Sequence, residues 1–240
     1  MRMFAGPNGS GKSILKSYLP APLLGVYLNP DEIEAALRRE GYLDLRALGV
    51  ATTASEVLPW FTSSELLSSE GLLAAAQRLR FTDGKLMLEG VDANAYLASV
   101  AVDFLRSRFL TLRTSFTFET VMSHPGKIDL LQEAHREGYR TYLYYVATED
   151  PAINISRVRS RVILGGHPVP EDKIITRYHR SLDLLIQAIR QTNRAYIFDN
   201  SSENPTNYTW VAEITEGRTL ELKTTRVPAW FKRSVLERIG

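Results

Sequence analysis

A glycine-rich run that follows a short apolar stretch constrains this 240-residue chain more than any other feature. Residues 6–13 read Gly-Pro-Asn-Gly-Ser-Gly-Lys-Ser, which matches the phosphate-binding pattern G-x-x-x-x-G-K-[ST], also called Walker A. The pattern is informative only between a strand and a helix, and residues 2–5 and 12–19 have the apolar patterns of those two elements. The sequence therefore predicts a nucleotide-binding α/β fold.

The residue types of this run suit polyphosphate chemistry. Glycines let the backbone turn its N–H groups toward phosphate oxygens, and the following helix adds its positive end. All eight residues are candidate nucleotide ligands: Gly6, Pro7, Asn8, Gly9, Ser10, Gly11, Lys12 and Ser13. The Lys12 ammonium would reach the β and γ phosphates, and the Ser13 hydroxyl would bind Mg²⁺. A plain glycine turn is the alternative, and the full pattern in its proper place disfavours it. We expect a nucleoside triphosphate, ATP, as the ligand.

Strands and helices alternate along most of the chain. Apolar and aromatic runs predict strands, and periodic patterns with capping residues predict helices. The strands are expected at 26–28, 115–118, 141–146 and 195–198, and the helices at 31–39, 94–112, 128–137 and 174–192. A further helix is expected to begin at Asp150-Pro151 and to carry Arg157, Arg159 and Arg161. Alternation of this kind indicates a parallel sheet covered on both faces, the three-layer α/β/α arrangement of P-loop proteins.

Two regions depart from this alternation. Residues 43–92 carry mixed signals, with a helix expected at 72–79, and we interpret them as a helical insertion. Residues 210–214 and 219–223 flank Glu216-Gly217-Arg218 as the strands of a β-hairpin would. The expected organisation is a kinase domain over 1–204 and a hairpin and helix extension over 205–240.

Composition excludes several classes of protein. Lys and Arg number 29 against 27 Asp and Glu, which leaves a net charge of +2 and no basic stripe for long nucleic acids. The chain has no cysteine, so disulfides, thiolate zinc sites and cysteine nucleophiles are excluded. The four histidines are too scattered to suggest a metal cluster. Without a leader-like start or an apolar run of about 20 residues, a cytoplasmic protein without a membrane segment is expected.

Two carboxylates follow predicted strands, where open α/β sheets place ligand-contacting groups. Asp31 comes after the second strand and could take the proton of an acceptor hydroxyl, but Asn29-Pro30-Asp31 also fits a helix N-cap. Glu119 ends the next strand, followed by Thr120, and could contact substrate or hold Mg²⁺; a surface carboxylate without a role is the alternative. The strand at 141–146 lacks the terminal Asp of a Walker B motif, so the acidic role falls to Asp31 and Glu119.

Three arginines are candidates for neutralising a transferred phosphoryl group. Arg157 and Arg161 are one helical turn apart and are expected to project toward the loop at 165–170, which contains His167. Arg177 follows on the next helix. A mobile arginine lid is a common means of stabilising charge in phosphoryl transfer, whereas solvated helix arginines are the alternative.

The chain resembles the zeta-toxin family of P-loop kinases in several short segments. The resemblance comprises residues 6–13, Asn-Pro-Asp-Glu-Ile at 29–33, Phe-Thr-Phe-Glu-Thr-Val-Met-Ser at 116–123, Arg157-Val158, Arg161-Val162, the loop at 165–170 and Arg177-Tyr178. The segments occur in family order over roughly residues 1–200. Residues 43–92 and the tail from 210 lie outside it.

The resemblance implies a kinase that uses Mg-ATP to phosphorylate the 3′-hydroxyl of UDP-N-acetylglucosamine, with an antitoxin as protein partner. It implies that Lys12 and Ser13 serve ATP and Mg²⁺, that Asp31 is the base, and that Glu119 and Thr120 contact the acceptor. Arg161 and Arg177, with Arg157 as an alternative to Arg161, would stabilise the γ phosphate. Other acceptors, such as a nucleotide, a dinucleotide, an antibiotic or a polynucleotide end, remain open, as does an ATP-dependent switch without an acceptor.

Overall fold

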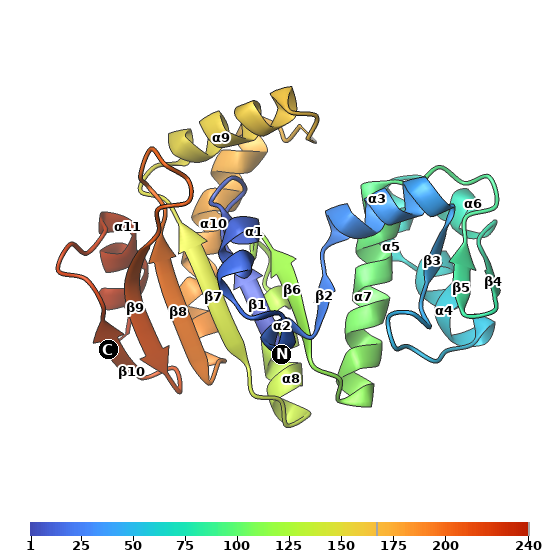
Figure 1. The fold of residues 1–240 in the computed structure, drawn as a ribbon, viewed down its shortest axis with the longest axis horizontal. Helices are drawn as coiled ribbons and strands as arrows, with labels where there is room; N and C mark the ends of the chain where they lie inside the picture. The colour runs from blue at the N-terminus through green and yellow to red at the C-terminus, as the bar shows by residue number, and fades with distance from the viewer. Residues whose placement is uncertain (167, 240) are drawn as a thin grey trace. The chain divides into compact units, whose positions relative to one another are not determined.

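The larger of the two sheets has seven strands (Figure 1). The computed structural model describes residues 1–166 and 168–239. The sheet has the order β10-β9-β8-β7-β1-β6-β2. Its strands are β1 (Arg2–Ala5), β2 (Val26–Leu28), β6 (Phe116–Thr120), β7 (Tyr142–Ala147), β8 (Arg194–Asp199), β9 (Thr209–Thr215) and β10 (Thr219–Leu222). Strands β6, β1, β7 and β8 pair in parallel, which confirms the predicted sheet type.

Contacts divide the chain into two compact units, and each is described by itself. The first unit comprises Met1–Leu24 and Thr117–Gly240, and the second comprises Gly25–Phe116. The helical segments of the first unit are α1 (Lys12–Leu15) with a 3₁₀ turn (Lys16–Tyr18), α2 (Ala21–Leu24), α8 (Gly126–Arg136), α9 (Pro151–Ile163), α10 (Glu171–Arg190) and α11 (Ala229–Phe231), which continues as a π-helical turn (Lys232–Leu236). The helix predicted at 12–19 is therefore shorter than expected, because its α-helical part ends at Leu15 and a 3₁₀ turn follows.

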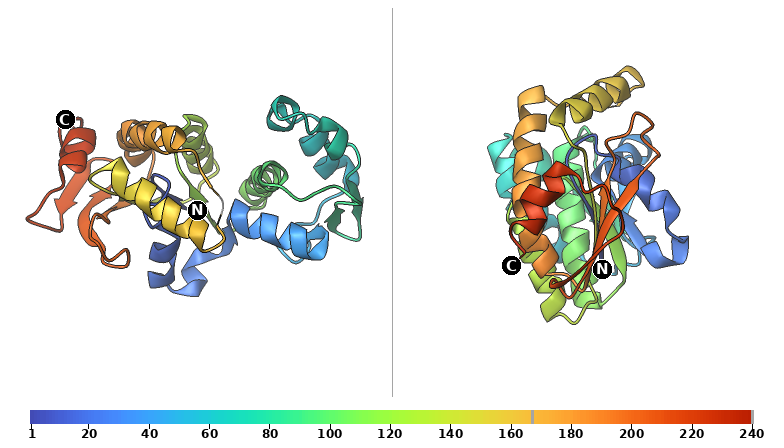
Figure 2. Two further views of the ribbon diagram at one scale, coloured as in Figure 1. Left: turned by 90° about the horizontal axis from the view of Figure 1, so that it is seen from above. Right: turned by 90° about the vertical axis from the view of Figure 1, so that its left-hand side faces the viewer.

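Helices of the first unit pack on both faces of the sheet, because successive strand residues point to opposite faces. On one face Phe4 stacks on Tyr144, with ring centroids 4.8 Å apart, in a cluster that includes Leu15 of α1. On the other face the Tyr145 hydroxyl contacts Ser181 of α10 at 3.0 Å. Helices α1 and α10 thus cover opposite faces (Figure 2), which gives the expected three-layer α/β/α fold.

The C-terminal hairpin is present where the sequence predicts it, but it is part of the main sheet. Strand β9 pairs antiparallel with β8 as well as with β10. Val211, Ala212 and Ile214 of β9 are fully buried, as is Trp230 of α11. Residues 205–240, predicted to be a hairpin and helix extension, thus contribute apolar side chains to the core of the first unit.

The second unit contains a small sheet that the helical-insertion prediction missed. Its strands β3 (Tyr42–Asp44), β5 (Lys85–Met87) and β4 (Arg80–Thr82) pair antiparallel. Its helices are α3 (Pro30–Glu40), α4 (Ala54–Thr62), α5 (Glu65–Ser69), α6 (Leu73–Ala76) and α7 (Ala95–Leu112). The expected helix at 72–79 is reduced to the single turn of α6. The unit begins at Gly25 and ends at Phe116, so it is larger than the region from 43 to 92.

Candidate phosphate-binding site

The loop between β1 and α1 has a backbone that only glycine tolerates at two points. Gly6 has a φ of 141°, and a Cβ there would lie 2.0 Å from the Val146 carbonyl oxygen. Gly9 has a φ of 74°, and a Cβ there would lie 2.6 Å from the Asn154 carbonyl oxygen. Because no side chain fits at such distances, the close approach of the loop to β7 and α9 requires glycine.

Lys12 begins α1 and folds back over this loop. Its ammonium donates hydrogen bonds to the carbonyl oxygens of Gly6 and Pro7, both at 2.9 Å. The positive charge therefore lies next to the loop backbone, at the N-terminal end of the helix, where an anion is favoured. The role of Lys12 as a phosphate-binding residue stays a prediction.

Three side chains that the sequence analysis missed hold the outer side of the loop. Asn154 of α9 donates through Nδ2 to the Asn8 carbonyl at 2.6 Å. Asn200, directly after β8, donates through Nδ2 to the Ser10 carbonyl at 2.9 Å, and the Tyr208 hydroxyl donates to the Gly11 carbonyl at 2.6 Å. Asn200 could have been suspected from its place at the end of a predicted parallel strand. Asn154 and Tyr208 carry no sequence signal of this role.

One polar side chain of the loop, that of Ser10, fits an anionic ligand. Within the described part of the chain, Asn8 Oδ1 and Ser10 Oγ are buried without a hydrogen-bond partner, although buried polar groups are normally paired. The Ser10 hydroxyl is a donor that a phosphate oxygen can satisfy. Burial raises the pKa of Tyr208 to about 12, so its phenol stays protonated and continues to donate to the loop at neutral pH.

Ser13 and Glu119 are brought together by the pairing of β1 with β6. Phe4 lies opposite Glu119 in the register, and the Ser13 hydroxyl donates to Glu119 Oε2 at 2.9 Å. A hydroxyl and a carboxylate are oxygen donors of the kind that Mg²⁺ prefers, so these two residues fit the predicted ion. Thr120 follows on β6, and its hydroxyl accepts a hydrogen bond from the Met122 N–H at 3.0 Å. Among the described residues no group of three or more His, Asp or Glu side chains gathers at one place.

The candidate arginines do not share one environment. Arg157 donates to the Ser202 carbonyl at 2.8 Å, and burial lowers its pKa. Arg161 lies instead against Gly166, where a Cβ would meet its Cγ at 2.7 Å. The expectation that both project toward the loop at 165–170 is therefore wrong for Arg157, because the Ser202 carbonyl binds its guanidinium. Arg177 is half-buried on α10, and His167 lies outside the described residues.

Asp31 lies in the second unit, at the second residue of α3. Asn29 caps this helix, since its side-chain oxygen accepts the Asp31 N–H at 2.9 Å. Of the two alternatives for Asp31, the N-cap role thus belongs to Asn29, and the exposed Asp31 carboxylate is not used for capping. Its role as a base stays a prediction.

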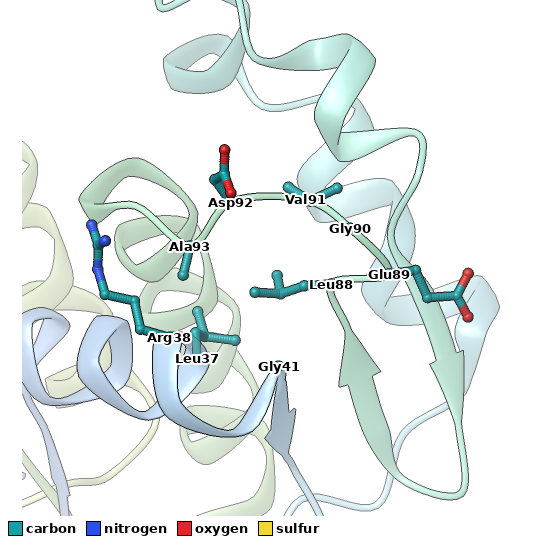
Figure 3. A pocket seen from close by; sticks show the side chains of 9 residues that line it. All are labelled: Leu37, Arg38, Gly41, Leu88, Glu89, Gly90, Val91, Asp92 and Ala93. Carbon is teal, nitrogen blue, oxygen red and sulfur yellow. The ribbon is translucent and has the colours of Figure 1, made fainter.

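The second unit also has a pocket of about 620 Å³ that the sequence did not predict (Figure 3). It lies at the C-terminal end of α3, between that helix and the segment that follows β5. Its lining residues are Leu37, Arg38, Gly41, Leu88, Glu89, Gly90, Val91, Asp92 and Ala93. Arg38 is paired with Glu34 at 2.5 Å, so its charge is already compensated. The pocket therefore combines an apolar floor with charged side chains at its edge.

Comparisons with known proteins agree with this architecture. No protein-family model matches the chain. An uncharacterized protein of Haemophilus influenzae is 32% identical over 63 residues, which are 26% of this chain and 45% of that protein.

Among solved structures, the AvrRxo1-ORF1:AvrRxo1-ORF2 complex with sulphate ions has a chain that matches with a TM-score of 0.50 and 14% identity, covering 93% of this chain and 61% of that chain. The native complex of AvrRxo1-ORF1 and -ORF2 matches with the same TM-score and identity, and 60% of that chain is covered. A chain of the PezAT chromosomal toxin-antitoxin system of Streptococcus pneumoniae matches with a TM-score of 0.48 and 14% identity, covering 88% of this chain and 70% of that chain.

The chain thus spans about three fifths of the length of the AvrRxo1 chains that it matches. At this identity the likeness defines the fold, a three-layer α/β/α arrangement around a mostly parallel sheet. No helix within residues 1–166 and 168–239 is both long and apolar enough to cross a bilayer.

Proposed function

We propose that the chain is a Mg-ATP-dependent phosphotransferase of the zeta-toxin kind, which transfers a γ-phosphoryl group to a hydroxyl of a small molecule. The observation that carries the proposal is the glycine loop with Lys12 folded over it and Ser13 hydrogen-bonded to Glu119. The lysine ammonium, the loop backbone and the paired hydroxyl and carboxylate supply charges and donors of the kind that a bound triphosphate needs.

In this proposal the loop residues bind, and do not react. The Lys12 ammonium exchanges its contacts with the Gly6 and Pro7 carbonyls for contacts with phosphate oxygens, and the buried Ser10 hydroxyl donates to the same group. Ser13 and Glu119 would hold Mg²⁺. Glu119 and Thr120 are also proposed, from the family resemblance, to contact the acceptor. When bound, Mg²⁺ supplies neutralisation of the phosphate charge.

Asp31 is proposed to accept the proton of the acceptor hydroxyl. The acceptor oxygen forms a bond to the γ phosphorus, the bond from that phosphorus to the bridging oxygen breaks, ADP leaves, and the hydroxyl proton moves to the Asp31 carboxylate. The exposed carboxylate supports this role, since Asn29 relieves it of helix capping. Arg161 and Arg177, with Arg157 as an alternative to Arg161, are proposed to stabilise the charge on the transferring oxygens.

The acceptor and the partner are proposed from resemblance. UDP-N-acetylglucosamine heads the candidate acceptors, and a nucleotide, a dinucleotide, an antibiotic or a polynucleotide end are its alternatives. The structurally similar AvrRxo1-ORF1 was solved in complex with AvrRxo1-ORF2, which supports a protein partner, an antitoxin, for this chain. A cytoplasmic location fits these proposals. The chain has candidates for an acceptor base and for lid arginines. A non-kinase switch needs neither, so their presence together favours the kinase over the switch.

The experiment that tests this function measures ADP release and phosphorylated product with Mg-ATP and a panel of hydroxyl compounds led by UDP-N-acetylglucosamine. We expect Asp31→Asn to lower transfer by about 10²–10⁴-fold while ATP still binds. The matched control is Glu40→Gln, which removes an exposed carboxylate at the other end of α3 and leaves transfer unchanged. Wild-type transfer by Asp31→Asn would overturn the assignment of the base, and ATP turnover that no acceptor stimulates would favour the switch.

A further inference from the structure

The carbonyl groups of the phosphate loop are bound from outside by side chains of distant parts of the chain. Asn154, Asn200 and Tyr208 bind the carbonyls of Asn8, Ser10 and Gly11, as described above. The three donors come from α9, from the end of β8 and from the segment that leads into β9. They are 146, 190 and 197 residues away from their acceptors. The loop is therefore held by tertiary structure as well as by its own glycines.

Holding a carbonyl also fixes the N–H of the same peptide. A trans peptide is planar, and its C=O and N–H point in opposite directions. Each carbonyl that these side chains bind therefore directs the N–H of the next residue, Gly9, Gly11 or Lys12, away from the side chain. These are the groups that would bind phosphate oxygens. The Gly11 carbonyl also accepts the N–H groups of Ile14 and Leu15 in α1, so Tyr208 adds to a contact that the helix already makes. The three side chains thus keep the loop in its binding conformation when no nucleotide is present.

The surroundings of the two asparagines favour their donor side. Asn200 is fully buried and its Nδ2 reaches both the Ser10 and the Pro205 carbonyls, whereas its Oδ1 has no partner in the described part of the chain. An unpaired buried acceptor lowers the stability of the folded protein. The favourable contribution of the Asn200 amide therefore comes from the two hydrogen bonds that its Nδ2 donates. For Asn154, the Thr148 hydroxyl donates to Oδ1, which orients Nδ2 toward the loop.

We propose that Asn154, Asn200 and Tyr208 are positioning residues that preset the phosphate loop for its nucleotide. The proposal rests on the proposed function only in that the loop binds a triphosphate. Their loss weakens nucleotide binding and loosens the loop, but leaves the rate at saturating nucleotide unchanged, because none of them touches the reacting atoms.

Two variants test the inference in the full chain. Tyr208→Phe removes one hydroxyl and keeps the ring that packs edge-on against Tyr18, with centroids 6.0 Å apart. Asn200→Asp keeps the shape but turns an oxygen toward the Ser10 and Pro205 carbonyls. The matched control is Tyr18→Phe. The Tyr18 hydroxyl donates a hydrogen bond to the Thr206 carbonyl, in the segment that also contains Tyr208, and this bond does not involve the loop carbonyls.

Two measurements keep this inference separate from the proposed function. Amide hydrogen exchange of residues 6–13 without nucleotide is expected to be faster in Tyr208→Phe and Asn200→Asp than in wild type and in Tyr18→Phe. The Kd for Mg-ATP is expected to rise about 2- to 10-fold in Tyr208→Phe, and by more than about tenfold in Asn200→Asp, with kcat retained.

Unchanged exchange of the loop in Tyr208→Phe overturns the positioning role, whether or not the chain binds ATP and whether or not Asn200→Asp folds. Faster loop exchange in the two variants than in wild type, combined with a wild-type protein that does not bind Mg-ATP, would support the positioning role and overturn the proposed function. A fall in kcat with unchanged Kd would also contradict the inference, since it would place these side chains in the reaction itself.

Discussion

The phosphate loop and the connection between α9 and α10 are both predicted to contact phosphate, but they differ in how firmly the protein holds them. In the loop, Ser10 is fully buried and the carbonyls on its outer side are hydrogen-bonded. At the end of α9, Ile163 and Leu164 are 85% and 87% exposed. One region is thus shaped before a ligand arrives, whereas the other is open to solvent.

This difference suggests a division of work between the two regions. A preformed loop gives affinity, because no ordering free energy is spent when the nucleotide binds. Arg161 near the end of α9 and Arg177 in α10 lie on either side of this connection in the sequence. Arginines there suit a rate effect, since they can stabilise charge that develops only during transfer. The link between Arg159 of α9 and Glu171 of α10, at 2.5 Å, ties the two helices near this connection. We therefore expect substitutions in the two regions to change different kinetic constants.

Removing an arginine of the open region gives the largest expected effect. Arg161→Ala and Arg177→Ala are each expected to lower kcat by about 10²–10³-fold, with the Kd for Mg-ATP changed less than about threefold. Arg180→Ala is the control, because it removes an exposed arginine of α10 that has no proposed role in the reaction. Steady-state kinetics with a separate binding titration distinguish the two constants. Weaker ATP binding with normal kcat in an arginine variant would reverse the proposed division.

An alanine in place of glycine compares the two regions directly. Gly6→Ala is expected to weaken Mg-ATP binding on the order of 100-fold, because its Cβ would lie 2.0 Å from the Val146 carbonyl oxygen and the loop must shift. Gly165→Ala also introduces a side chain at a positive φ, of 89°, but its Cβ meets no described atom within 4 Å.

Calorimetric titration of both variants is the measurement, with Gly138→Ala as a control for backbone strain alone. Gly138 has a φ of 79° and a Cβ there is equally uncrowded by described atoms. Equal losses of affinity in Gly6→Ala and Gly165→Ala would show that the two regions are alike in what they contribute to binding.

The sequence predicted the local parts of this site and missed the distant ones. The glycine run, the strand before it and Lys12 follow from consecutive residues, so pattern and position suffice. Asn154 and Tyr208 bind the loop carbonyls only because the fold brings α9 and the segment before β9 to the loop. A single Asn or Tyr in a sequence carries no pattern from which such a contact can be predicted. The pairing of Ser13 with Glu119 was within reach, because both follow strands that a parallel sheet places side by side.

The fold shows the same limit. Alternating strands and helices predicted the parallel sheet and its covering layers. The strands of the small sheet in the second unit have three residues each, too few for alternation to be visible. The C-terminal hairpin was predicted from its turn. Its pairing with β8 depends on which edge strand of the sheet lacks a neighbour, and the order of strands in a sheet cannot be predicted from a local sequence pattern.

Replacing the carboxylate beside Ser13 tests whether the held region also carries the metal. Glu119→Gln keeps an oxygen that can accept from the Ser13 hydroxyl at the observed 2.9 Å, but removes the negative charge. We expect about a tenfold higher Mg²⁺ concentration for half-maximal turnover, since charge on the ligands sets the affinity of such sites. The control is Glu133→Gln, an exposed carboxylate on α8. An unchanged Mg²⁺ requirement would leave Glu119 with the acceptor alone.

The smallest expected effect is a change in alkaline stability that reports on the outer side of the loop. Burial, followed by the charge of Tyr18, raises the pKa of Tyr208 from 10.0 to about 12, so folding favours the protonated phenol. Its contribution to stability is fully present below pH 10 and is lost as pH rises toward 12, because the unfolded chain releases the proton first. Between these values the free energy of unfolding of wild type should fall more steeply than that of Tyr208→Phe, by less than one proton in slope. Burial also raises the pKa values of Tyr145 and Tyr178, but both residues remain in the variant, so their contributions cancel in the difference. Urea unfolding at pH 9, 10 and 11 is the measurement. Parallel curves for the two proteins would mean that the Tyr208 phenol is not buried beside the loop in solution, and the contrast with the open connection between α9 and α10 would then lose one of its supports.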